Sequence, residues 1–132
     1  MKPWEVGQAR EVEVEFPDGT IDSSLEMTRL GETTFQFEAS CFLLDFYFHD
    51  IAEAVFDADR LLVKALVSRS GLEVRCWFVA QASVEQPHVK DVLDKLYSEQ
   101  IMWEWGMGVL MLHIPPERRA EVASEVTAAL TK

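Results

Sequence analysis

Three polar side chains in the first half of the chain have the spacing of a metal site. Asp45, His49 and Glu53 stand four residues apart, so on a helix they would form one stripe of carboxylate and imidazole ligands. Cys41 and His49 could also form a thiol–imidazole pair for nucleophilic catalysis, although no local signature supports it. Neither pattern is specific. The sequence therefore predicts a polar seam in a largely buried segment, and it predicts no catalytic residue, metal or cofactor.

The most definite local feature is a run of alternating glutamates. Glu11, Glu13 and Glu15 alternate with apolar residues over 10–16, which predicts a strand with Val12 and Val14 inward and the glutamates outward. Three like charges on one strand face repel one another and require solvent or a cation. We interpret the segment as an edge strand whose charge resists further pairing; a docking surface for a basic partner and a calcium site are the alternatives.

The sequence predicts that strands position these residues in the first part of the chain, and that the second part contains both strands and helices. We expect a single α+β domain over 1–132, in which an antiparallel N-terminal β-sheet or partial barrel precedes a ferredoxin-like β-α-β-β-α half. Ser83 and Gln86 have capping-box spacing before Pro87. The segment 40–59 is ambiguous, and we favour a loop before its strand. The predicted strands are 10–16, 25–30, 33–38, 51–56, 61–67, 73–80, 101–105 and 109–114; the helices are 87–99 and 116–131; and Ser70-Gly71 is expected to join 61–67 and 73–80 as a hairpin.

The alternation of the last strand predicts two sheet faces. If Leu110, Leu112 and Ile114 meet the helices, Met111 and His113 point the opposite way, and we expect them beside Trp77 and Arg75. The acidic part of the chain, a partner or a second copy would cover so apolar a face. A pocket between the two parts of the chain would have these lining residues: His113, Trp77, Arg75, Trp105 and His49.

Charge divides the chain unevenly. The net charge of −11 lies entirely in residues 1–59, an acidic mainly-β sub-region with 14 acidic and 3 basic residues, whereas residues 60–132, a neutral α+β sub-region, have 9 of each. This excess would repel nucleic acid and anionic lipid, so we expect neither as a partner. No signal peptide and no run of about 18 apolar residues is present. We expect a cytoplasmic protein with Cys41 and Cys76 buried and reduced.

Residues 35–79 resemble an uncharacterised bacterial family, domain of unknown function 4265. The segment His49-Asp50-Ile51-Ala52-Glu53-Ala54 corresponds to an acidic "Gly-Asp-Val-Val-x-Ala"-like segment of that family, with His49 in place of the usual glycine. The closest match is Arg69-Ser70-Gly71-Leu72-Glu73-Val74-Arg75, which is similar to an "Arg-Ser-Gly-x-x-x-Val-Arg"-like turn. The loop 41–47 lacks the proline that is customary in the family. The resemblance implies the element order given above, and it implies no activity.

Two classes of function fit these patterns. The first is a non-enzymatic interaction protein whose acidic face binds a basic protein, as small acidic immunity proteins do; this analogy rests on composition alone. The alternative is a small-molecule-binding or enzymatic domain with the pocket described above. A homodimer built on the Trp- and Met-bearing sheet face is a further hypothesis.

Overall fold

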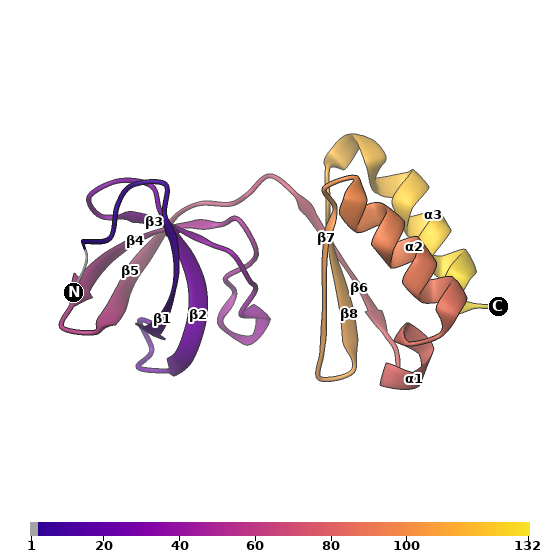
Figure 1. The fold of residues 1–132 in the computed structure, drawn as a ribbon, viewed down its shortest axis with the longest axis horizontal. Coiled ribbons are helices and arrows are strands. Elements are labelled where there is room, and N and C mark those ends of the chain that lie inside the picture. Colours follow the sequence, from indigo (N-terminus) through magenta and orange to yellow (C-terminus); the bar gives the residue numbers. More distant parts are fainter. Residues whose placement is uncertain (1–2) are drawn as a thin grey trace. The chain divides into compact units, whose positions relative to one another are not determined.

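Five strands with alternating inward side chains form a closed barrel in the first part of the chain (Figure 1). The computed structural model describes residues 3–132. Each strand pairs antiparallel with the next in sequence, and a parallel pairing of β1 with β5 closes the barrel. The strands are β1 (Ala9–Glu15), β2 (Ile21–Arg29), β3 (Thr34–Phe37), β4 (Ile51–Asp57) and β5 (Arg60–Ser68).

Aromatic rings fill the barrel. Val14 and Phe16 are buried, as the alternation of β1 predicts. The Phe37 ring stacks at 5.0 Å from that of Phe46 and at 6.2 Å from that of Phe16. Phe46 comes from the segment between β3 and β4, which holds a short 3-10 helix, η1 (Phe42–Leu44), and an isolated β-bridge between Cys41 and Phe46. The prediction of a loop before a strand in this segment is confirmed.

Three antiparallel strands and their helices make up the rest of the chain. The strand order is β6-β8-β7, and Figure 1 shows α2 and α3 together on one face of this sheet. The fold is mixed α+β, and the strand–helix–strand–strand–helix order of this part is confirmed. Its elements are β6 (Glu73–Phe78), α1 (Gln81–Val84), α2 (Pro87–Ser98), β7 (Met102–Gly106), β8 (Val109–Ile114), η2 (Pro116–Arg118) and α3 (Arg119–Leu130).

Local details of this part differ from the sequence pattern in two places. Pro87 opens α2 as predicted, but the capping box is wrong, since Ser83 lies within α1 and no side chain caps α2. The predicted hairpin of 61–67 with 73–80 is also wrong. β5 pairs with β4 and β1, whereas β6 pairs with β8. Ser70-Gly71 therefore joins two separate sheets.

The structural boundary falls after the charge boundary. The chain divides into two compact units, Met1–Ser70 and Gly71–Lys132. The first has 14 acidic and 6 basic residues, a formal charge of −8, and the second has 9 and 6, a charge of −3. The difference from the sub-regions 1–59 and 60–132 arises because Arg60, Lys64 and Arg69 belong to the barrel unit. Over residues 3–132, no helix is both long and apolar enough to cross a membrane.

Candidate functional site

Two of the three β1 glutamates are paired with a cation. The Arg60 guanidinium donates from Nε to Glu13 Oε2 at 3.0 Å and from Nη1 to Glu15 Oε1 at 2.9 Å. The hydrogen bond to Glu13 is the main reason that the pKa of Arg60 lies above its ordinary value. Closure of the barrel by the pairing of β1 with β5 thus brings Arg60 beside two glutamates that are distant in sequence. The single positive charge of Arg60 compensates one of these two negative charges.

The interpretation of β1 as an edge strand is wrong. β1 pairs with β2 along most of its length, and its residues 13–15 pair with β5. Closing a barrel removes the unpaired strand edge that charged side chains would otherwise protect. Glu13 and Glu15 therefore need another explanation than resistance to strand addition, whereas Glu11 lies in the part of β1, residues 9–12, that pairs with β2 alone.

Glu11 differs from the other two, because it faces a second glutamate. Glu11 on β1 and Glu26 on β2 are direct cross-strand partners, and both are exposed. The carboxylate of Glu11 accepts one long hydrogen bond from Ser24 Oγ, at 3.5 Å. In the described part of the chain neither glutamate forms an ion pair. Like charges directly opposite one another destabilise a sheet by up to about 1 kcal/mol.

A third glutamate continues this line across the barrel surface. The backbone N–H of Glu38 donates to the Glu26 carbonyl at 3.0 Å. Its carboxylate accepts from Thr28 Oγ1 at 2.8 Å and lies 3.3 Å from His49 Nε2. We call these three residues the acidic row: Glu11, Glu26 and Glu38. Glu11 of this row was predicted from the sequence, whereas Glu26 and Glu38 were not.

His49 contacts Glu38 of this row, and it forms neither the metal stripe nor the thiol pair considered from the sequence. The segment that contains it is not helical: Asp45 and His49 adopt positive φ angles of 59° and 67°, and Glu53 lies in β4. Asp45, His49 and Glu53 therefore share no helix face. The imidazole contacts Glu38 and stacks on the Phe48 ring at 3.8 Å, whereas the Cys41 thiol lies 3.9 Å from Asp22 Oδ2. A φ of 67° is in the left-handed region that favours glycine.

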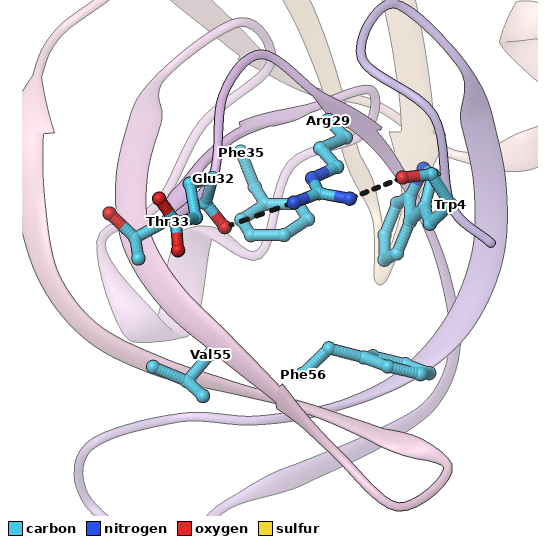
Figure 2. Close-up of a pocket in the computed structure, with 7 residues that line it drawn as sticks. All are labelled: Trp4, Arg29, Glu32, Thr33, Phe35, Val55 and Phe56. Carbon is cyan, nitrogen blue, oxygen red and sulfur yellow. Dashed lines mark hydrogen bonds between the residues drawn. The ribbon is translucent and has the colours of Figure 1, made fainter.

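A pocket of about 260 Å³ opens within the barrel unit (Figure 2). The indole ring of Trp4 lies 4.9 Å from the Phe35 ring and 5.8 Å from the Phe56 ring, centroid to centroid. In Figure 2 the Arg29 guanidinium, Trp4 and Phe35 lie on one side of the space, and Phe56 and Val55 lie on the other. The lining residues are Trp4, Arg29, Glu32, Thr33, Phe35, Val55 and Phe56.

Backbone carbonyl oxygens hold the Arg29 side chain in this pocket. Its Nε donates to the Gly31 carbonyl at 2.8 Å, Nη1 donates to the Trp4 carbonyl, and Nη2 lies 3.5 Å from the Glu32 carbonyl. The contact with Trp4 ties the N-terminal segment to β2. The sequence analysis missed this residue. Arg29 is nevertheless conspicuous as the one Lys or Arg between residues 11 and 59.

The residues predicted on the second sheet do not share one face. Trp77 and Trp105 are the cross-strand partners of Leu110, and Arg75 is the partner of Leu112. Both tryptophans pack against the core beneath the helices. The expected position of His113 beside Trp77 and Arg75 is wrong, because His113 pairs with Val74 and Met102 on the opposite face. The register therefore separates the proposed pocket residues.

The face turned away from the helices has its own polar contact. His113 is 1% exposed, and its Nε2 lies 2.7 Å from Glu104 Oε2. Phe78, on the same face, is 87% exposed. This face carries methionines but no tryptophan, so the expected Trp- and Met-bearing face does not form. Among residues 3–132 neither cysteine forms a disulfide bond. Cys41 is half-buried, but the expected burial is wrong for Cys76, which is exposed; partial desolvation still raises the pKa of its thiol.

Comparison with known proteins supports the fold alone. No family model and no curated protein matches the sequence, so the resemblance to domain of unknown function 4265 stays a prediction. One solved structure, entitled "Novel crystal structure of a hypothetical protein from Neisseria gonorrhoeae", is similar to this chain with a TM-score of 0.53 and 13% identity. The similarity covers 94% of this chain and 87% of that one.

Proposed function

We propose that this protein is a non-enzymatic interaction protein and that the acidic row binds a basic protein partner. The observation that carries the proposal is the Glu11–Glu26 pair, two exposed carboxylates placed directly opposite each other without a cation. A lysine or arginine from a partner would relieve their repulsion and gain an ion pair with each. Such surface charges mainly accelerate association and select the sign of the partner.

The charge of the whole barrel unit supports the same partner. The unit has a formal charge of −8, while Arg60 and Arg69 already neutralise carboxylates within it. The remaining excess therefore lies on side chains such as Glu11 and Glu26 that have no internal cation. A negative field of this kind attracts basic proteins and repels nucleic acid. By analogy of composition, an immunity-like role fits this profile.

Affinity capture with three forms of the full chain tests the proposal. The baits are the wild-type protein, the Glu11→Gln/Glu26→Gln variant and a matched control, Asp91→Asn/Asp94→Asn, which removes the same charge from exposed positions of α2. Proteins captured from the source organism at about 50 mM salt are purified, and their affinities are measured by calorimetry. We expect a basic partner whose Kd rises about tenfold for the acidic-row variant, chiefly through slower association.

The matched control separates a site from a general field. We expect the Asp91→Asn/Asp94→Asn variant to bind the partner within about twofold of the wild type. Equal losses for both variants would show that only net charge matters. Partners that are acidic, or whose binding does not weaken with salt, would refute a role of the acidic row in recognition.

A further inference from the structure

The guanidinium of Arg29 has unused hydrogen-bonding capacity inside an aromatic pocket. An arginine side chain has five N–H donors. Arg29 makes three contacts, and all three are with backbone carbonyl oxygens. The contact with the Glu32 carbonyl is long. Among residues 3–132, no carboxylate lies within ion-pair distance of Arg29. Two N–H donors and a full positive charge therefore remain for a ligand.

The other arginines of the barrel unit make the contrast clear. Arg60 binds two carboxylates, and so does Arg69, whereas Arg10 donates to the Pro3 carbonyl and lies over the Trp4 ring. Arg29, on a barrel unit of charge −8, has none, although acidic side chains are abundant. Carbonyl dipoles orient the guanidinium but do not neutralise it. An anion that reaches the pocket would form charge-assisted hydrogen bonds, which are about twice as strong as neutral ones.

The other lining residues determine the size of the anionic ligand and the apolar group that it must have. Trp4 and Phe35 are buried aromatic walls, and Phe56 and Val55 face them. A volume of about 260 Å³ is below the range of about 300–1,000 Å³ that is usual for drug-sized ligands. The ligand is therefore small, with one planar or branched apolar group and one acidic group.

We propose that this pocket binds a small organic carboxylate with an aromatic or branched aliphatic body. The carboxylate accepts hydrogen bonds from the unused N–H groups of Arg29, and the apolar body lies against Phe56 and Val55, which are the more accessible apolar lining residues. The site is independent of the acidic row. A cationic ligand, which aromatic walls can also bind, is disfavoured because Arg29 already places a positive charge there.

Glu32 provides a test of the sign of the ligand charge. Its exposed carboxylate lines the same pocket and forms no ion pair with Arg29. Glu32→Gln removes a negative charge near the proposed carboxylate, so we expect the affinity for an anion to rise about twofold to threefold. The same substitution would weaken the binding of a cation. Glu117→Gln, at an exposed position of η2 outside the pocket lining, is the matched control and should leave the affinity unchanged.

The assay is an NMR titration of the ¹⁵N-labelled full chain with phenylacetate and, separately, 3-methylbutanoate. We expect Kd values of about 1 mM, typical of a ligand with about ten non-hydrogen atoms, and shifts at the Trp4 indole N–H. Phenylacetamide, which has the same shape without the charge, should bind at least about tenfold more weakly. N-acetylphenylalanine distinguishes the source of the carboxylate, since it binds more tightly than phenylacetate only if a peptide C-terminus is the ligand.

Two further variants keep the protein core intact. Val55→Asp places a negative charge at an exposed position of the pocket and should weaken phenylacetate about tenfold, whereas Val67→Asp, on β5 and outside the pocket lining, should not. The proposal is overturned if neither acid binds at about 20 mM, if the amide binds as well as the acid, or if benzyltrimethylammonium binds more tightly than phenylacetate. Tighter binding of phenylacetate to wild type than to Glu32→Gln would also overturn it.

Discussion

Asp50 is a buried carboxylate that should be essential to the stability of the barrel unit. Its Oδ2 accepts from the Tyr47 N–H at 2.9 Å and from Arg69 Nη1 at 2.8 Å, and its Oδ1 accepts from the Ser70 N–H at 2.9 Å. The side chain is 2% exposed. These bonds tie the loop before β4 to the chain that leaves β5.

The same guanidinium offers a matched comparison. Arg69 also donates to Asp45 Oδ2 at 2.7 Å, but that carboxylate is 73% exposed. In Asp50→Asn the amide NH₂ must face a donor in either orientation, so at least one hydrogen bond and the buried charge pair are lost. We expect the free energy of unfolding to fall by about 2–4 kcal/mol. Asp45→Asn keeps a residue that tolerates the positive φ, and it should cost less than about 1 kcal/mol.

Urea unfolding followed by NMR is the suitable assay. Trp4 is the one tryptophan of residues 1–70, so its indole N–H reports the barrel unit separately from the other three tryptophans. Urea is preferred to guanidinium chloride because the salt would screen the ion pairs being compared. Monitoring the units separately also avoids assuming that both unfold in one transition.

The two asparagine variants must differ for the reasoning to hold. If Asp50→Asn and Asp45→Asn lower the free energy of unfolding equally, within about 0.5 kcal/mol, burial does not govern the strength of these pairs. A loss of less than about 1 kcal/mol for Asp50→Asn alone would show that other donors or water replace its contacts.

Three other substitutions probe the core and the surface charges. Phe37→Ala removes a fully buried ring from the barrel and should lower the free energy of unfolding by about 3–5 kcal/mol in the same urea assay; a loss below about 2 kcal/mol would contradict the packing described. Arg60→Met should lower the free energy of unfolding by much less than Phe37→Ala does, and by less still at high salt, because its ion pairs are about one-third exposed; an equal loss would contradict this. Hydrogen bonding to Arg118 lowers the pKa of Glu121 from its ordinary value of 4.5, so this pair stabilises the protein at neutral pH and the contribution is lost as the pH falls through the lowered pKa. A ¹³C titration of the Glu121 carboxylate measures that pKa, and Arg118→Gln should raise it; an unchanged midpoint would refute the pairing.

Local patterns predicted the elements well, because each depends on neighbours in sequence. Alternation over 10–16 places Val14 and Phe16 inside the barrel. Proline at the start of a helix identified α2, whose bounds agree closely with the predicted 87–99. Val89, Leu93 and Leu96 of this helix are buried at helical spacing, whereas Tyr97 is 63% exposed.

The candidate site was predicted only in part, because it depends on which strands meet. Glu11 was selected from the sequence, but its opposite neighbour Glu26 follows from the register of β1 with β2. The Arg60 contacts depend on barrel closure. Within β8 the alternation was right, yet the register with β6 puts His113 opposite Val74 and away from Trp77. A shift of one residue in register exchanges the two faces of a strand, so alternation within single strands cannot decide this.

The sequence by itself determined the α+β class, the order of the main elements and the alternation of side chains within β1 and β8, because propensity and hydrophobic period act over a few residues. It also determined that the barrel unit would be acidic. Only the tertiary structure decided which of those charges are compensated, since Arg60 and Arg69 reach their carboxylates across strand pairings. The Arg29 pocket likewise exists only in the folded barrel, because closure brings together Trp4 and Phe56, side chains that lie far apart along the chain.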